Sequence, residues 1–395
     1  MPEKISYTFV NESVREYRQE DDISLYEDSD LLGRDLSGTI LVKWTNQTYH
    51  DENLRAMFTP EWDKVSAISK ANRGRHRNQY YAGLIVRASF DVDFLDDQTS
   101  YSIEHVSQPT GADSCNDGLT AYVTANTIIV RDHHDPQQQE RKISHPNFAR
   151  LHDVQFSQDG KRIITASSSL DMLYELDIGG EEAWSLDLWD ISDTNLLGQR
   201  FRRTVPEDSD GWLINPNPVQ LRDNPELLGA NCVLSKPELY DGLGLPTNLI
   251  PVFINSIAYG NKDEILTTSF HKGEGWKIDR AKNQITVLAK DMRYPHGLRR
   301  DPMLGGYIVT DTGHEKTLFL SEDGEKELAV NFQKLKGHKP GQEQVKWLQY
   351  TTRLKGGTYC AILSSRQQIM LFDPITKVKR EIPYSPDWGI QLVTD

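Results

Sequence analysis

Cysteine is scarce in this sequence. The three residues of this type, Cys115, Cys232 and Cys360, lie more than 100 positions apart in a chain of 395. Disulfide frameworks and structural zinc sites need cysteines that come in pairs, so the sequence predicts neither. An odd number of widely separated thiols suits a reducing compartment, and we therefore expect a cytoplasmic protein.

Long apolar runs and an excess of basic residues are also missing. No stretch of about 18 apolar residues occurs, and no basic segment followed by an apolar one marks a secretory signal. Lys and Arg number 44 against 58 Asp and Glu, which gives a net charge of −14. A surface of this sign repels phosphate backbones and anionic lipids, so we expect a small-molecule partner rather than nucleic acid or a membrane.

Sustained helical periodicity is absent from about residue 80 onward. Short runs of Val, Ile, Thr, Tyr and Phe alternate there with Asp-Gly, Gly-Gly and Gly-Asn turn signals, which is an all-β pattern. Residues 1–37 are polar and include acidic runs, and we expect them to form a solvated arm. Residues 38–395 are expected to form one domain, with an insertion at about 195–250 that is rich in Pro, Asn, Asp and Gly.

The strand-and-turn pattern repeats along the chain. Copies begin at His152, Asn255, His296 and Trp347, and a last copy at Trp388 ends after one strand. The last three offsets are 41, 51 and 41 residues, which is the period of propeller blades. With one earlier blade at about 80–145, the pattern predicts a six-bladed β-propeller. The wide gap before Asn255 leaves a seventh, degenerate blade open.

The closing of the ring follows from the incomplete last copy. Its single strand needs outer partners, and residues 38–44 supply the obvious candidate. We therefore expect the N- and C-terminal segments to share one blade, because such a closure removes the open sheet edges that invite aggregation.

A resemblance to known propellers rests on five segments: NSIAY at 255–259, ILTTS at 265–269, WKIDR at 276–280, PHG at 295–297 and VTDTG at 309–313. Together, over about residues 145–330, they resemble arylsulfotransferase-type, NHL-repeat and gluconolactonase or strictosidine-synthase-like propellers. The resemblance implies the fold. This chain has Phe253 and Phe270 where arylsulfotransferases have His and Arg, so the resemblance implies no single activity.

Polar side chains stand at the starts of the innermost strands, which in a propeller face the central channel. His152, Asn255 and His296 occupy one aligned position, and Asp311 follows on the neighbouring strand. The two imidazoles could act as general acid or base, and the Asn255 amide could donate to a developing oxyanion. These four are the candidate catalytic residues.

Two further roles are open at the same end of the ring. His152, His296 and Asp153 could hold one divalent metal ion. Trp347 and Trp388 could stack on a planar substrate or plug the channel. The polar residues could also hold ordered water or tie neighbouring blades together.

The leading hypothesis is a small-molecule enzyme whose active site lies in the channel funnel, capped by the 195–250 insertion. Hydrolase, lyase, cyclase and transferase chemistry all remain open. The alternative is a non-catalytic propeller that acts as a ligand- or protein-binding platform, because fold alone decides neither. WD-type platforms repeat a Trp-Asp signature in each blade, whereas this pair occurs here once, at 189–190.

Overall fold

Strands make up nearly all regular structure in the computed structural model, as the alternation of β-branched residues and turns predicts. The structure describes residues 8–11, 18–29, 37–45, 82–89, 101–107, 109–115, 118–124, 126–133, 140–188, 203–204, 211–214, 232–235, 252–302, 305–337, 347–384 and 388–394. Within this part of the chain, no helix is long and apolar enough to cross a membrane.

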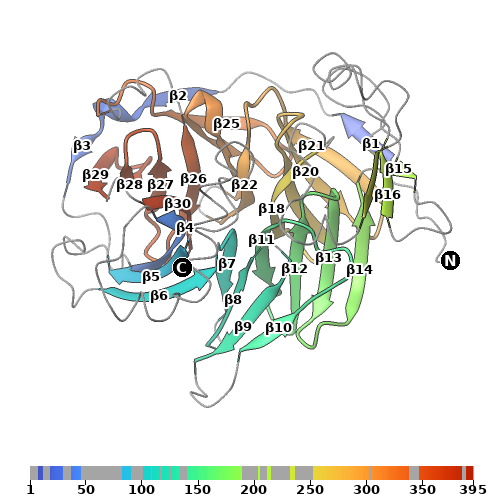
Figure 1. Ribbon diagram of the computed structural model, residues 1–395. Coiled ribbons are helices and arrows are strands. Elements are labelled where there is room, and N and C mark those ends of the chain that lie inside the picture. The colour runs from blue at the N-terminus through green and yellow to red at the C-terminus, as the bar shows by residue number, and fades with distance from the viewer. Residues whose placement is uncertain are drawn as a thin grey trace.

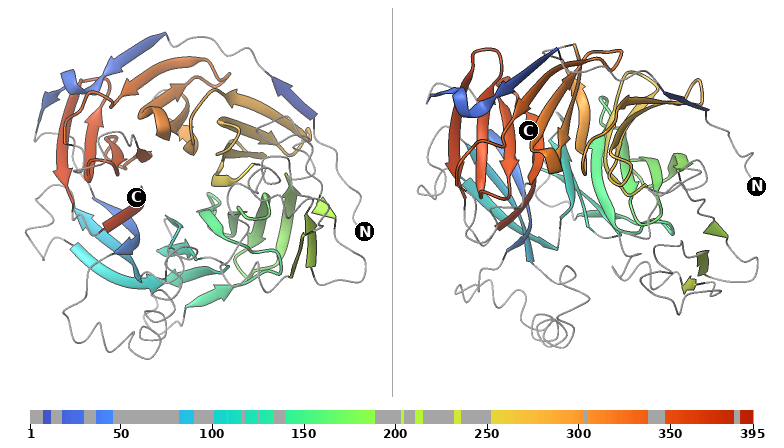
Figure 2. Two further views of the ribbon diagram at one scale, coloured as in Figure 1. Left: turned by 45° about the horizontal axis from the view of Figure 1, so that its top comes forward. Right: turned by 90° about the horizontal axis from the view of Figure 1, so that it is seen from above.

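Six sheets stand around one axis, and each forms a blade (Figures 1 and 2). One blade consists of β7 (Gly111–Ser114), β8 (Leu119–Val123), β9 (Ile128–Asp132) and β10 (Arg141–Ile143). The next consists of β11 (Leu151–Phe156), β12 (Arg162–Ser167), β13 (Met172–Asp177) and β14 (Glu182–Asp187). The third consists of β18 (Ile254–Tyr259), β19 (Glu264–Ser269), β20 (Glu274–Asp279) and β21 (Gln284–Ala289). The next two are β22 (His296–Asp301), β23 (Gly306–Asp311), β24 (Lys316–Leu320) and β25 (Lys326–Asn331); and β26 (Leu348–Arg353), β27 (Tyr359–Leu363), β28 (Gln368–Asp373) and β29 (Val378–Pro383).

The sixth blade closes the ring as the sequence predicts. Its inner strand is β30 (Trp388–Thr394), which pairs antiparallel with β4 (Ser37–Thr45), and β5 (Ala82–Ser89) and β6 (Tyr101–Ser107) follow outward. The innermost strands β7, β11, β18, β22, β26 and β30 each contact the next around the circle, and β30 contacts β7. The six-bladed propeller is thus confirmed. The expectation of one blade at 80–145 is wrong, because β5 and β6 belong to the closing blade.

The expected solvated arm includes three short strands that pair with the ring. β1 (Thr8–Asn11), β2 (Gln19–Asp22) and β3 (Glu27–Asp28) run parallel to β21, β25 and β29 as fifth, outermost strands, and the dark blue segments in Figure 2 follow the rim. A short 3₁₀ turn, η1 (Ile23–Leu25), buries Ile23 completely in an apolar cluster shared by the blades β22–β25 and β26–β29.

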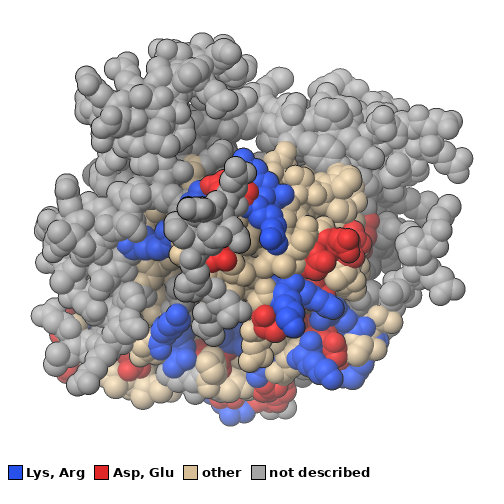
Figure 3. Space-filling view, turned by 90° about the horizontal axis from the view of Figure 1, so that it is seen from below, with Lys and Arg blue, Asp and Glu red and all other residues tan. Residues whose placement is uncertain are grey.

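Ion pairs explain how acidic residues come to lie at this rim. Glu20 pairs with Lys316 at 3.0 Å, Asp22 with Lys334 at 2.7 Å, and Asp28 with Lys379 at 2.7 Å. Figure 3 shows basic and acidic side chains interleaved on the described part of another face. The net negative charge is therefore partly matched locally, although each exposed pair contributes only about 0–1 kcal/mol.

Blades pack through apolar side chains that alternate along the strands. One inter-blade cluster centres on Trp276, which is fully buried, and includes Ile254, Ile265 and Leu173. Within the 195–250 range, β15 (Arg203–Thr204), β16 (Gly211–Ile214) and β17 (Cys232–Ser235) form a separate three-stranded sheet. The expected lid role of this insertion lies outside the described residues.

We expect deletion of residues 388–395 to abolish cooperative folding. The deletion removes β30, leaves β4 as an unpaired inner edge and opens the ring between β26 and β7. Thermal unfolding followed by near-ultraviolet circular dichroism should show no sharp transition, and binding of a hydrophobic dye should rise. A chain that lacks only Asp395 is the control. A normal, cooperative transition in the long deletion would contradict the assigned closure.

Candidate functional site

A left-handed backbone residue precedes three consecutive inner strands. Arg150, Phe253 and Tyr294 have φ angles of 56°, 50° and 59°. Each stands two residues before a candidate site residue: His152, Asn255 or His296. Residues other than glycine rarely adopt this backbone conformation, which costs about 1 kcal/mol or more of conformational free energy per residue. The same irregularity thus recurs at the same place in three blades.

A break in strand pairing accompanies each of these residues. The register shifts between Leu151 and Val154 in β11, between Ile254 and Ser256 in β18, and between His296 and Arg299 in β22. Such bulges re-aim side chains at strand ends. Because neighbouring inner strands carry them at equivalent positions, His152, Asn255 and His296 lie at similar height around the axis, as the repeat predicts.

The structure shifts the alignment of the next blade by two residues. In β26 the register breaks between Leu348 and Tyr350, so Gln349 corresponds to Asn255. Trp347 then corresponds to Phe253 and stands just before the strand. The alignment of the repeat copies had put Trp347 at the position of His152 and His296. The bulge, which sets the register of the strand, cannot be recognised from the sequence.

Seven rings form a continuous row at this end of the ring, which we call the aromatic cluster: His152, Phe253, Phe270, His271, Tyr294, His296 and Trp347. Phe253 lies 5.5 Å from His152 and 5.2 Å from Phe270, both edge-on, between ring centroids. Phe270 in turn stacks on Tyr294 at 4.7 Å and meets His296 edge-on at 5.6 Å. The two histidines are therefore on the same end of the propeller, with two phenylalanines between them in the row.

Hydrogen bonds fix the ring of His296, which is 4% exposed. Its Nδ1 lies 2.9 Å from the carbonyl oxygen of Tyr294 and 2.7 Å from Oγ1 of Thr312. A carbonyl can only accept, so Nδ1 carries the hydrogen and the neutral ring has its lone pair on Nε2. Trp347 stands beside this imidazole at 6.3 Å, which places the predicted stacking residue within the aromatic cluster.

The other predicted residues divide between this cluster and its support. Asn255 accepts a hydrogen bond from Thr268 at 2.6 Å through Oδ1. Asp311 does not contact the His296 ring in any described bond; it accepts the backbone N–H of Arg293 at 2.8 Å and pairs with His314 at 2.9 Å. Asp311 thus holds the loop that presents Tyr294, and its neighbour Thr312 orients His296.

A buried ion pair positions Trp347. Arg366 donates to Glu315 through Nη1 at 2.6 Å and Nη2 at 3.1 Å, and both side chains are fully buried. Glu315 also accepts the backbone N–H of Trp347 at 3.1 Å. This bidentate pair joins two blades at the start of β26. Trp388 begins β30 opposite Thr45, but its side chain lies outside what the structure describes.

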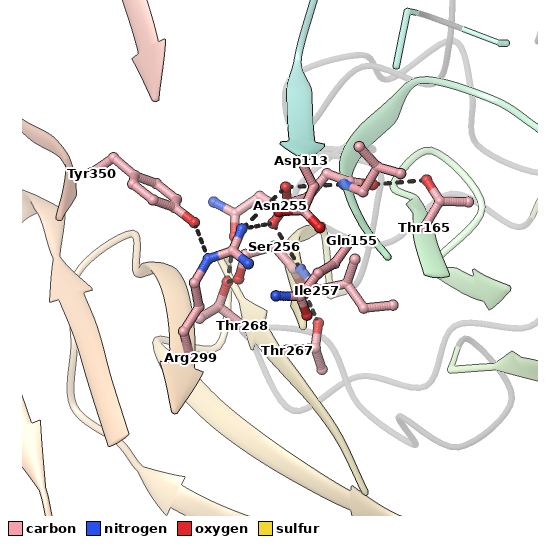
Figure 4. Close-up of polar contacts among 12 residues, drawn as sticks. Asp113, Gln155, Thr165, Asn255, Ser256, Ile257, Thr267, Thr268, Arg299 and Tyr350 are labelled. Carbon is pink, nitrogen blue, oxygen red and sulfur yellow. Dashed lines mark hydrogen bonds and ion pairs between the residues drawn. The ribbon is translucent and has the colours of Figure 1, made fainter. Parts of the chain in front are cut away.

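A second polar group, which the sequence analysis missed, lies further along the inner strands. We call it the axial network: Asp113, Asp153, Arg299 and Tyr350. Arg299 lies 3.2 Å from Asp153 and donates to the Tyr350 hydroxyl at 2.6 Å, and Figure 4 shows it between Tyr350 and Asp113. These residues come from β7, β11, β22 and β26, so the network spans four blades. Gln155, Ser256 and Thr268 lie nearby in the same view.

Burial governs the titration of this network. Burial raises the pKa of Asp113 to about 6, although Arg299 opposes the shift, and it raises the pKa of Asp153 as well. Burial also raises the pKa of Tyr350 to about 12. One guanidinium thus faces two carboxyl groups, and a proton on one of them relieves their repulsion.

The structure gives no support to the expected metal site. Asp153 is engaged by Arg299 and by the backbone N–H of Ile257 at 3.1 Å, and the cation Arg299 opposes a second cation there. In the described ranges, no group of three or more His, Cys, Asp or Glu side chains could hold a metal ion. His152 and His296 stand in the aromatic cluster, and Phe253 and Phe270, which offer no ligand, lie between them in the row.

Comparisons with known proteins agree on the fold alone. No protein-family model and no curated protein sequence matches the chain. A chain from a nidogen/laminin complex superposes with a TM-score of 0.51 at 11% identity, over 91% of this chain and 97% of that one. A protein of unknown function from Bacteroides caccae gives 0.50 at 10% identity, over 90% and 97%. A streptogramin B lyase gives 0.41 at 13% identity, over 70% and 83%.

The raised pKa of Asp113 in the axial network predicts that the free energy of unfolding falls as the pH rises. Asp113 holds its proton up to about pH 6 when folded, whereas an unfolded Asp releases it near pH 4. The folded state therefore binds more protons than the unfolded state between these two pH values. The stabilisation that protonated Asp113 gives to the folded state is complete below pH 4 and is lost as the pH rises through 6. The roughly two-unit shift corresponds to about 3 kcal/mol of unfolding free energy.

Urea unfolding between pH 4 and 7 measures this dependence. In Asp113→Asn we expect the slope to weaken clearly, because the amide does not titrate. The same substitution at the exposed Asp263 should leave the slope unchanged. Equal slopes in the wild type and Asp113→Asn would show that Asp113 does not titrate in this way.

Proposed function

We propose that the protein is a small-molecule enzyme whose active site is the aromatic cluster, with His296 as its general base or acid. The observation that supports this most is the fixed imidazole of His296. Its Nδ1 is bonded to a carbonyl oxygen, so Nε2 is the atom that takes up or releases a proton. A histidine oriented by a bond to one nitrogen is the usual arrangement of a catalytic base.

The bonds of His296 favour this role over a tie between blades. Tyr294 stands two residues before His296, the first residue of β22, and Thr312 belongs to the 3₁₀ turn η5 (Thr312–His314) of the same blade. These bonds therefore orient the ring within one blade. The left-handed conformation of Tyr294, which places the accepting carbonyl, is backbone strain of the kind that collects at functional sites.

The rest of the aromatic cluster suits a flat substrate. Phe270, His271, Tyr294 and Trp347 are partly exposed, so their rings can contact a ligand, whereas Phe253 is 5% exposed. A substrate that lies over Phe270 has His296 beside that ring, and His152 lies beyond Phe253. One imidazole can then remove a proton while the other donates one, a pattern that serves hydrolase, lyase, cyclase and transferase reactions.

Turnover of a mixed small-molecule extract tests the proposal. We expect purified protein to alter at least one compound of a cell-derived metabolite pool, followed by mass spectrometry. His296→Gln should slow that reaction about 100-fold or more at equal concentrations of folded protein, which is the scale of a lost general base. His314→Gln, at an exposed histidine of the turn η5 in the same blade, is the control. If no compound changes, or His296→Gln reacts at the wild-type rate, the enzyme proposal fails and a binding platform becomes the better account.

A further inference from the structure

Arg150 is a largely buried cation that the acid–base step does not use. Its Cζ lies 5.6 Å from the centroid of Phe253, within the aromatic cluster. Burial lowers the pKa of Arg150, and no neighbouring carboxylate opposes the shift. Among the residues that the structure describes, none forms an ion pair with this guanidinium. By contrast, Arg299 and Arg366 each face a carboxylate.

This imbalance needs a physical explanation. A cation over an aromatic face recovers only part of the free energy that burial costs it. Buried guanidinium groups are normally satisfied by a carboxylate or a phosphate, which their planar fork matches with two parallel N–H donors. Arg150 has the aromatic half of such a site, and the described residues supply no anion to it.

Asn255 supplies a second unmet donor in the next blade. The residue is 4% exposed, and its Oδ1 accepts the Thr268 hydroxyl. Its Nδ2 is buried, and the described residues offer it no hydrogen-bond acceptor. Buried amide donors nearly always have a partner, so an unpaired one points to an absent water or ligand. Asn255 lies at the height of His152 and His296, two residues after Phe253.

We propose that the aromatic cluster binds a planar organic carboxylate, with its anionic group on Arg150 and its flat part along the rings that follow Phe253. A further acceptor atom of the ligand takes the hydrogen of Asn255 Nδ2. The inference names the substrate class of the site under Proposed function and rests on that assignment of the site.

A carboxylate fits better than a phosphate group. Arg150 is largely buried, and its two parallel donors match the two oxygens of a carboxylate, whereas the other guanidinium at the cluster, that of Arg293 at 5.4 Å from the Tyr294 ring centroid, is exposed to solvent. A phosphate group carries more charge and a third oxygen, and phosphate sites normally add backbone N–H groups or further cations. The neighbouring rings favour an aromatic or conjugated body, because stacked rings gain most from flat partners.

A pair of probes that differ only in charge tests this on the full chain. We expect 2-naphthoate to bind at least about 10-fold more tightly than neutral 2-naphthamide in isothermal titration calorimetry, as a charge-assisted contact implies. In Arg150→Gln this difference should disappear while the melting temperature stays equal or rises, because the variant removes an uncompensated buried charge.

The controls separate this inference from the catalytic one. Arg141→Gln changes an exposed arginine that donates to the carbonyl of Ile178, and it should keep the full preference for the anion. No saturable binding of 2-naphthoate, equal binding of both probes, or an unchanged preference in Arg150→Gln would each overturn the inference, whatever His296→Gln does to turnover.

Discussion

The pairing of β30 with β4 is the interaction on which the rest of the structure depends. It joins the last described strand to a strand from the N-terminal part of the chain in one blade, so that every inner strand has a neighbour on both sides. An open row of blades could spread, and the starts of its inner strands would not share one axis. Closure brings His152, Asn255 and His296 to one end of the propeller at similar height. The rim strands β1 to β3 then cover three blade edges on the outside.

A repeated backbone irregularity turns this symmetric ring into a site. Left-handed residues precede three inner strands, and a second series occupies the turn after the second strand, at Asp171, Gly273, Glu315 and Gln367. The first series contributes rings and a guanidinium to the aromatic cluster. In the second series, Asp171 accepts the backbone N–H of Val252, and Glu315 accepts that of Trp347. Each carboxylate therefore fixes the start of the inner strand in the next blade. The supporting residues and the proposed site thus occupy separate positions of one repeat.

Much of the fold could be predicted from the sequence because the repeat is strong. The spacing of Asn255, His296 and Trp347 predicted the blades, and the incomplete copy at Trp388 predicted the closure by residues 38–44. The acidic run from Glu20 to Asp22 indicated a solvated arm instead of a rim strand. Its partners are lysines hundreds of residues away, and composition alone cannot show such pairing.

The candidate site was harder to predict, because it depends on strand register and on contacts between residues that are far apart in the sequence. The aligned histidines were found because they share a repeat position, but their surroundings depend on bulges that shift the register. Phe253 and Phe270 read as departures from a related family, whereas in the structure they form the middle of the aromatic cluster. Arg150 precedes the aligned position by two residues, and the axial network joins residues from β7, β11, β22 and β26 that share no motif.

The tautomer of the neutral His296 ring tests the proposed acid–base role most directly. Nitrogen-15 chemical shifts assigned by comparison with His296→Gln distinguish the two neutral tautomers of this ring. The structure predicts that the hydrogen is on Nδ1, bonded to the Tyr294 carbonyl, and that Nε2 carries the lone pair and takes up the proton as the pH falls. A neutral ring with its hydrogen on Nε2 would contradict the central claim, because the atom that faces away from Tyr294 could not then act as the base.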